Sequence, residues 1–134
     1  MQLAADANVL LSAVVGGRAR DVLAHPRVEE VVTTASTLAE VQEYLSQLAR
    51  RKRLALDTVL LAAATLPVTV VERPVYAAKI KTAMKSLGRR DPDDVELLAL
   101  ALHARIPVWS NDKDFEDAGV DWFTTAALLK KLGI

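Results

Sequence analysis

Short apolar runs of strand length alternate along this chain with longer stretches of helical periodicity. The runs at 28–34 and 68–72 are brief and rich in β-branched residues, which is typical of strands. Between them, leucine and valine recur at helical spacing through 36–53. Parallel strands require crossover connections, and these crossovers are right-handed. The alternation therefore predicts a parallel sheet covered by helices on both faces.

The whole pattern predicts a three-layer α/β/α fold around a central parallel sheet of about five strands. Strands are expected at 2–6, 28–34, 68–72, 107–110 and 121–125. Helices are expected at 18–24, 36–53, 56–66, 75–88, 91–106 and 126–133, with a short one between the last two strands. Gly88 is placed to cap the helix at 75–88. A length of 134 residues suits one domain, 1–134, with a buried core.

The core of this fold has to be built mainly from leucine, valine and alanine. Hydrophobic residues make up 51% of the chain but aromatic residues only 4%. Trp109 and Trp122 lie in strand-like stretches and are expected to pack in the core or at a sheet edge. The absence of cysteine excludes disulfides and thiolate catalysis. The start of the chain lacks a basic leader and carries Asp6 within its apolar stretch, so we expect a cytoplasmic protein without a membrane segment.

Charge balance excludes a global attraction to nucleic acid or to an anionic membrane. Seventeen basic residues balance seventeen acidic ones, so a polyanion has to meet a local patch. The densest basic run is Arg50–Arg53. Further basic residues follow at Lys79, Lys81, Lys85, Arg89 and Arg90. These stretches read as helical, and a solvated helix face is the simplest explanation for each residue taken singly.

Acidic residues recur where the predicted strands end. Asp6 ends the first strand, and Glu40 lies in the first turn expected after the second. Asp94 lies in the first turn of the helix before 107–110, and Asp112 and Asp114 follow that strand. Ligands of open α/β sheets bind beyond the carboxyl ends of the strands. These acids are therefore expected along one edge of the sheet.

Helix capping explains each of these acids when it is taken alone. Thr37 and Glu40 have the spacing of a capping box. Asp91 can cap a helix that has proline in its first position and acids, including Asp94, in its first turn. The remaining candidate caps are Asp6, Asn8, Asn111 and Asp112. Capping alone is the simpler explanation for any single residue.

Taken together, the acids indicate a shared cation. Two carboxylates at ~4 Å repel by about 4 kcal/mol at the effective dielectric of a protein surface. A divalent cation offsets that charge, and ligands that are all oxygen select Mg²⁺ or Mn²⁺. The chain has only two histidines, so a zinc or iron site is poorly supplied. Such a site suits attack of metal-activated water on a phosphate ester, with basic residues at the rim holding the flanking phosphates.

With these residues identified, the sequence resembles the PIN-domain ribonucleases, a family that includes the VapC toxins of toxin–antitoxin pairs. The resemblance rests on "LAADANVLLSA", "TLAEV", "RDPDDVELLALAL" and "VWSNDKDF", in that order and spacing. It implies a single PIN-like nuclease domain, with about five parallel strands between helices. It also implies hydrolysis of RNA phosphodiester bonds with one or two Mg²⁺ or Mn²⁺ ions. A toxin role, a homodimer and a small antitoxin partner follow from the family alone.

The resemblance also assigns roles to the acidic residues. Asp6 and Asp112 match the most direct metal ligands, and Glu40 and Asp94 match residues that bind metal or orient water. Asp114 is either an additional ligand or an exposed acid in the first turn of a helix.

Supporting residues follow from the same motifs. Asn8 and Ser110 match positions that hydrogen-bond the carboxylates. Asp91 fits a helix cap better than a ligand, and Glu43 fits a surface charge.

Two other functions remain open at this point. Haloacid-dehalogenase-like phosphatases also begin with an aspartate after a first strand and bind Mg²⁺. They carry a second aspartate two residues later, where this chain has Asn8. The other alternative is a catalytically inactive PIN-like module that binds RNA or a protein partner. Cleavage that requires a metal separates the nuclease from that module.

Overall fold

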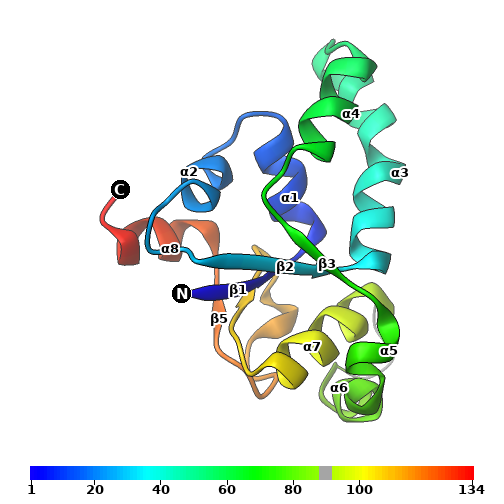
Figure 1. Ribbon diagram of the computed structural model, residues 1–134, viewed down its shortest axis with the longest axis vertical. Helices are drawn as coiled ribbons and strands as arrows, with labels where there is room; N and C mark the ends of the chain where they lie inside the picture. Colours follow the sequence, from blue (N-terminus) through cyan, green and yellow to red (C-terminus); the bar gives the residue numbers. More distant parts are fainter. Residues whose placement is uncertain (88–91) are drawn as a thin grey trace.

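The computed structural model describes residues 1–87 and 92–134, which form a five-stranded sheet with helices on both faces (Figure 1). The strands are β1 (Gln2–Ala5), β2 (Glu30–Thr34), β3 (Thr69–Val71), β4 (Val108–Trp109) and β5 (Trp122–Phe123). Their order is β3-β2-β1-β4-β5, and every pairing is parallel. The predicted three-layer parallel α/β fold is therefore confirmed.

The helices divide into two layers. The helices are α1 (Ala7–Val14), α2 (Ala19–Leu23), α3 (Ala35–Lys52), α4 (Leu56–Ala64), α5 (Arg73–Tyr76), α6 (Ile80–Leu87), α7 (Pro92–Ala104) and α8 (Thr125–Leu132). Two short 3₁₀ helices are η1 (Ala77–Lys79) and η2 (Lys113–Phe115). Helices α1 to α4 and α8 lie on one side of the sheet, and α5 to α7 lie on the other (Figure 1). None of the helices in the described part of the chain combines the length and the apolar character needed to cross a bilayer.

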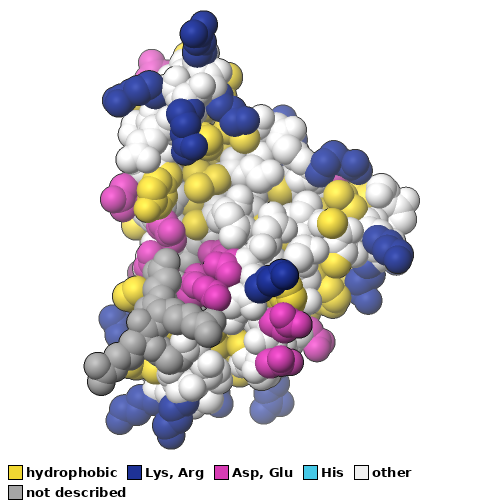
Figure 2. Space-filling model, turned by 180° about the vertical axis from the view of Figure 1, so that it is seen from behind, with side chains coloured by type: hydrophobic (Ala, Val, Ile, Leu, Met, Phe, Trp, Pro, Cys, Tyr) yellow, Lys and Arg dark blue, Asp and Glu magenta, His cyan; other side chains and the backbone are white. Residues whose placement is uncertain are grey.

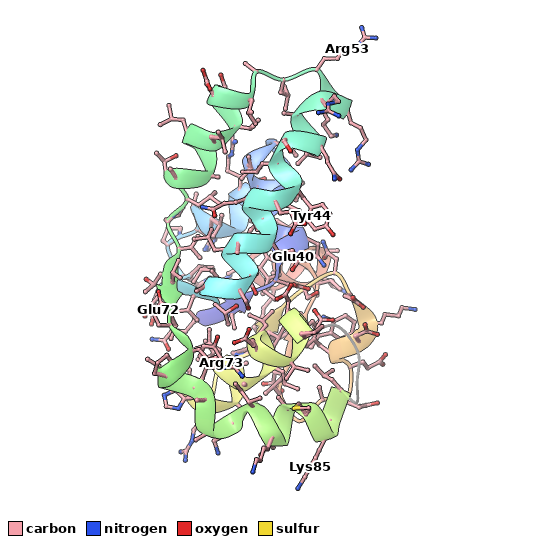
Figure 3. All side chains as sticks on the ribbon, turned by 90° about the vertical axis from the view of Figure 1, so that its right-hand side faces the viewer. Glu40, Tyr44, Arg53, Glu72, Arg73 and Lys85 are labelled. Carbon is pink, nitrogen blue, oxygen red and sulfur yellow. The ribbon has the colours of Figure 1, made fainter. Side chains whose placement is uncertain are left out.

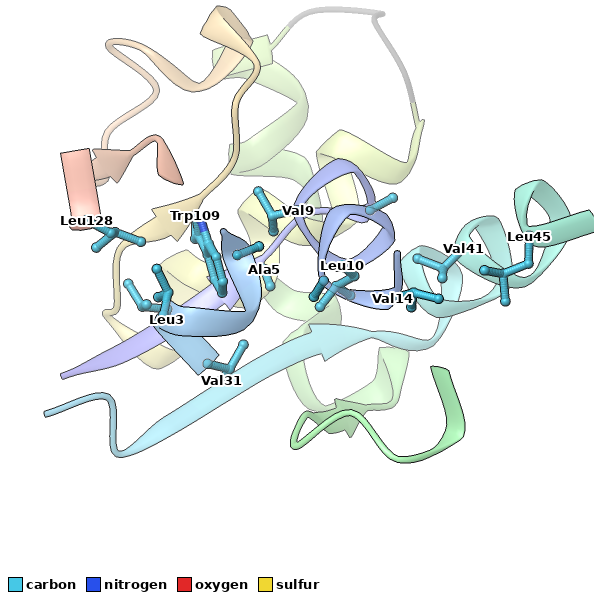
Figure 4. Packing of buried hydrophobic residues seen from close by; sticks show 14 of the residues in the cluster. Leu3, Ala5, Val9, Leu10, Val14, Val31, Val41, Leu45, Trp109 and Leu128 are labelled. Carbon is cyan, nitrogen blue, oxygen red and sulfur yellow. The ribbon is translucent and has the colours of Figure 1, made fainter. Parts of the chain in front are cut away.

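Successive residues of β1 contribute side chains alternately to the two hydrophobic cores. Successive side chains of a strand point to opposite faces of the sheet. Leu3 and Ala5 pack with Leu10 and Trp109 in the core beneath α1 (Figure 4). Ala4, between them, packs in the second core against α7. All three β1 residues are fully buried, so β1 is fixed between the layers and the residue that follows it has a defined place.

The structure corrects two expected elements. Residues 7–14, for which no helix was expected, form α1, and the Asp6 side chain accepts a hydrogen bond from its first N–H group. The single helix expected at 75–88 is instead divided into α5, η1 and α6. At this break, Tyr76 buries its ring in the second core and donates a hydrogen bond to Glu96 Oε1 at 3.0 Å. Burial and this carboxylate raise the pKa of the Tyr76 phenol above its ordinary value, so the hydroxyl remains a donor.

The proposed caps at Gly88 and Asp91, and the basic residues Arg89 and Arg90, lie outside the described residues. The proline of the expected N-terminal turn, Pro92, is the first residue of α7. The predicted buried helix is present as α7, since seven of its 13 residues are buried.

Helices α3 and α4 form an arm that extends beyond the sheet at the top of Figure 1. Helix α3 ends in a left-handed cap, where Arg53 has φ 52° and the Leu54 N–H donates to Ala49 O at 2.8 Å. Helix α4 packs back on α3 through the buried Val59, which lies in the same core as Leu45 and Ala49. Val59 therefore joins the two helices of the arm in the core beside Leu45 and Ala49.

Candidate metal centre

The predicted acids gather around one pocket beyond the carboxyl ends of the strands. Four of them, Asp6, Glu40, Asp94 and Asp112, line a pocket of about 300 Å³. Asp6 follows β1 directly, and its N–H donates to the carbonyl of Trp109 in the neighbouring β4 at 2.9 Å. Acidic side chains cluster at the middle of the face shown in Figure 2, in keeping with this pocket.

Asp6 is held rigidly at the pocket wall. Its side chain is buried, and Oδ1 accepts a hydrogen bond from the Ala7 N–H at 2.7 Å. Its Oδ2 accepts from the Ser110 hydroxyl at 2.6 Å and from the Asn8 amide at 3.3 Å. Asp6 therefore serves both as the cap of α1 and as an oriented carboxylate facing the pocket. The local capping explanation is correct for Asp6, but it does not exclude a role in the pocket.

Ser110 joins the two segments that carry Asp6 and Asp112. The hydroxyl is fully buried and accepts the Asp112 N–H at 3.0 Å while it donates to Asp6. Asn8 also donates to the Ser110 hydroxyl at 3.4 Å, and Asn8 Oδ1 accepts the Asn111 N–H at 3.3 Å. Both predicted supporting residues thus lie beside the acids, and their hydrogen bonds connect the start of α1 to the loop after β4.

Among the residues that the structure describes, Asp94, Asp112 and Asp114 bring their carboxylates close enough to share an ion. One carboxylate oxygen from each lies within 4.8 Å of the others. Asp94 is buried, whereas Asp112 and Asp114 are half-buried. Asp112 also caps η2, because its Oδ1 accepts the Asp114 N–H at 2.9 Å. Asp114 thus joins the acids, although it does not line the pocket.

This donor set suits a hard divalent cation. At 4.8 Å, two carboxylate charges repel by roughly 3 kcal/mol at an effective dielectric of 20. A cation shared by Asp94, Asp112 and Asp114 would offset that repulsion, and three carboxylates offer only oxygen ligands. Oxygen ligands favour Mg²⁺ and Mn²⁺ over zinc or copper. The residues present therefore fit the metal that the sequence predicts.

Glu40 reaches the pocket from a different place in its helix than expected. The cap of α3 is Thr34, whose Oγ1 accepts the Thr37 N–H at 2.9 Å, so the expected pair of Thr37 and Glu40 is not a capping box. Glu40 lies six residues beyond Thr34, in the second turn of α3 and not the first. Its half-buried side chain is one of those that line the pocket, and Figure 3 labels its place on α3.

Among the polar and aromatic residues that line the pocket, sequence reasoning missed Tyr44. Tyr44 lines the pocket together with Glu40, one helical turn earlier on α3 (Figure 3). The spacing of four residues was the only signal available, and it applies equally to surface residues. Glu43, expected to be a surface charge, is exposed and does not line the pocket.

A larger hollow lies at the opposite edge of the sheet. It has a volume of about 550 Å³, and its charged lining residues are Arg105 and Asp121. These residues precede β4 and β5, so this hollow is at the amino ends of the strands. One cation and one carboxylate do not form a metal-binding set. We therefore place the site at the smaller, acidic pocket.

Replacing Ser110 with alanine is expected to weaken metal binding by about 10- to 100-fold, because the hydroxyl orients Asp6 and the Asp112 backbone. It is also expected to lower the free energy of unfolding by about 1–3 kcal/mol, since buried polar groups lose their partner. Titration calorimetry with Mn²⁺ and urea unfolding measure the two effects. Thr65→Ala is a matched control, because this exposed hydroxyl bonds only carbonyls of its own helix. Unchanged Mn²⁺ affinity in Ser110→Ala would limit Ser110 to a structural role.

The order of the sheet and the position of the pocket define the class: a parallel α/β/α protein with an acidic pocket at the carboxyl edge. A family model for the PIN domain matches residues 5–133, and the chain belongs to the PIN-domain family. No curated protein sequence matches the chain significantly.

Solved structures share the fold at low sequence identity. PAE2754 from Pyrobaculum aerophilum is 15% identical with a TM-score of 0.75, over 99% of this chain and 90% of that one. VapC20 from Mycobacterium tuberculosis, described as a toxin that cleaves the sarcin–ricin loop, is 22% identical with a TM-score of 0.62, over 88% and 95% of the two chains. A chain of a toxin–antitoxin complex from Klebsiella pneumoniae is 20% identical with a TM-score of 0.63, over 92% and 97%. These likenesses establish the fold.

Proposed function

We propose that this protein is an endoribonuclease that hydrolyses RNA phosphodiester bonds at the acidic pocket with Mg²⁺ or Mn²⁺. One observation carries the proposal: in a chain of the PIN-domain family, Asp6, Glu40, Asp94 and Asp112 line a single pocket. A metal bound there would supply an activated water and offset charge on the phosphoryl oxygens. The single domain would span residues 1–134.

Each acidic residue has a proposed role in the pocket. Asp6 and Asp112 are direct metal ligands, and Glu40 and Asp94 bind metal or orient the attacking water. Asp114 is an additional ligand, supported by its place within 4.8 Å of Asp94 and Asp112.

Two residues support these ligands without binding the metal. Asn8 and Ser110 hold Asp6 in place through the hydrogen bonds to its Oδ2. The same two hydrogen bonds keep the carboxylate from rotating, which fixes the direction in which its ligand atom points.

We also propose that the protein is the toxin of a toxin–antitoxin pair and acts in the cytoplasm. The likeness to VapC20 and to a chain of the Klebsiella toxin–antitoxin complex supports this role. A small antitoxin protein and a second copy of the chain are the proposed partners. Co-expression with the gene that neighbours its own is the direct test of the antitoxin.

The nuclease activity is tested by incubating single-stranded and hairpin RNAs with the protein and Mn²⁺ or Mg²⁺. We expect cleavage that EDTA abolishes and that added metal restores, as followed on denaturing gels. RNA binding without cleavage, unchanged by EDTA, would support the inactive module in place of the enzyme. Hydrolysis of small phosphate monoesters alone would support a phosphatase, although the match to the PIN family favours the nuclease.

A further inference from the structure

Helix α3 carries a line of side chains away from the pocket. Glu40, Tyr44, Gln47 and Arg51 are spaced by four, three and four residues, so they lie on one face of the helix. Glu40 is half-buried at the pocket wall, whereas the other three are exposed. The positions of Glu40 and Tyr44 on the same side of α3, and of Arg53 at its end, can be followed in Figure 3. We call Tyr44, Gln47 and Arg51 the α3 track.

The distance from the pocket to the far end of the track suits a short stretch of nucleic acid. Arg51 lies 11 residues beyond Glu40 at the pocket wall, and at 1.5 Å per residue this corresponds to about 16 Å along the helix. Stacked nucleotides are separated by about 3.4 Å, so this distance matches roughly five nucleotides, and fewer in an extended strand. Glu40 and Arg51 both belong to the continuous helix α3, so the helix itself sets this spacing.

The order of chemical groups along the track matches a nucleic-acid strand. Tyr44 lines the acidic pocket and has 43% of its surface exposed, so part of the side chain is accessible to a ligand there. Bases of single strands stack on such aromatic side chains. The Gln47 amide can donate and accept hydrogen bonds, and the Arg51 guanidinium is suited to a phosphate.

The charge distribution favours the same ligand. The chain has no net charge, so a polyanion needs a local basic surface. Basic side chains cluster at the top of the face shown in Figure 2, above the acids, and the tip of α3 supplies Arg50–Arg53 there. The dipole of α3 favours a cation in its last turn. Stabilising the helix end does not need four consecutive cations.

We propose that the α3 track binds single-stranded RNA on one side of the scissile phosphate, with Tyr44 stacking on the adjacent base and Arg51 pairing with a phosphate several nucleotides away. The inference rests on the nuclease function proposed above and names the residues of α3 that would hold an unpaired strand. Paired bases cannot offer a face to Tyr44, so a fully double-stranded RNA should bind more weakly than a single strand.

Fluorescence anisotropy with a labelled single-stranded RNA of about 12 nucleotides tests the track. Binding is measured in Ca²⁺, with gels to verify that the RNA stays intact. Tyr44→Ala is expected to weaken binding by roughly 5- to 100-fold, the effect of losing one stacked base. Tyr44→Trp should restore binding, whereas Tyr44→Leu, which keeps apolar area without an aromatic face, should not.

Arg51 is tested through the dependence of binding on salt. Arg51→Ala should reduce the slope of log K against log salt by about 0.7, the value for one phosphate contact on a single strand. Lys130→Ala is the matched control, because Lys130 is an exposed cation in the last turn of α8. With a shortened RNA of roughly four nucleotides, the effect of Tyr44→Ala should persist and that of Arg51→Ala should disappear.

The outcomes separate this inference from the nuclease proposal. A wild-type protein that cleaves RNA, with Tyr44→Ala binding equally well, overturns the track alone. If Tyr44→Leu and Tyr44→Trp restore RNA binding equally, the proposed stacking of Tyr44 on a base is wrong. A change in oligomeric state in Tyr44→Ala, seen by light scattering, would show that this face contacts a second copy and would also overturn the track. A wild-type protein that neither binds nor cleaves RNA overturns both proposals.

Discussion

Asp112→Asn is expected to reduce RNA cleavage by at least about 10³-fold while the protein remains folded. Asparagine has nearly the same shape, and its side-chain oxygen can still accept the Asp114 N–H that Asp112 accepts at 2.9 Å. The substitution therefore removes a negative charge and little else. A catalytic metal contributes several kcal/mol, and each 1.36 kcal/mol corresponds to tenfold in rate. Cleavage of labelled RNA in Mn²⁺ measures the loss.

Thermal unfolding gives a second measure of the same substitution. Without metal, Asp112→Asn should be at least as stable as the wild type, because it removes one of three carboxylates within 4.8 Å. Mn²⁺ at ~100 times its Kd should stabilise the wild type by about 2.7 kcal/mol, or roughly 10 °C in Tm. Most of that rise should be absent in the variant.

Asp121→Asn is the control for the loss of charge alone, since Asp121 is exposed at the opposite edge of the sheet. It should leave both cleavage and the effect of Mn²⁺ unchanged. If Asp112→Asn retained cleavage within about threefold of the wild type, then Asp112 would not be a metal ligand. A uniform loss of activity in both variants would indicate a general effect of charge instead.

The layers of the fold were predictable because a sheet that is buried on both faces has a recognisable sequence pattern. Parallel strands covered by helices are short apolar runs, and α7 appears as a nearly continuous apolar helix. Helix α1 was missed because "ANVLLSAV" is short and has only two polar residues, Asn8 and Ser12, which are too few to establish helical periodicity. Its start was nevertheless visible, since Asp6 was identified as a candidate cap.

The proximity of the acids was predictable from the strand order, but the helix caps and pocket walls around them were not. Asp6 and Asp112 follow neighbouring parallel strands, so their proximity comes from the order of β1 and β4. The stretch "TTASTLAE" offers several serine and threonine residues as possible caps, and the end of β2 at Thr34 decides which of them is used. Tyr44 was missed because its importance depends on the pocket wall that α3 forms.

Trp109→Ala is expected to lower the free energy of unfolding by about 3–5 kcal/mol, a large share of the 5–15 kcal/mol that stabilises a typical domain. Trp109 is fully buried in the core beneath α1, and its indole N–H donates to Thr125 Oγ1 at 3.0 Å. Urea unfolding measures the loss. Trp109→Phe should cost less, because it keeps most of the buried ring and loses mainly this hydrogen bond.

Replacing Trp109 should also weaken Mn²⁺ binding at the site. The carbonyl of Trp109 accepts the Asp6 N–H, and Ser110 is the next residue. Trp122→Ala is a comparison for stability alone, since Trp122 is only half-buried but its indole N–H donates to the Ser110 carbonyl at 2.8 Å. If Trp109→Ala bound Mn²⁺ as tightly as the wild type at a temperature where it stays folded, β4 would position Asp6 and Ser110 without this side chain. Weaker binding by the folded variant would instead show that the packing of Trp109 in the core sets the geometry of the acids. The same side chain would then stabilise the fold and position the site.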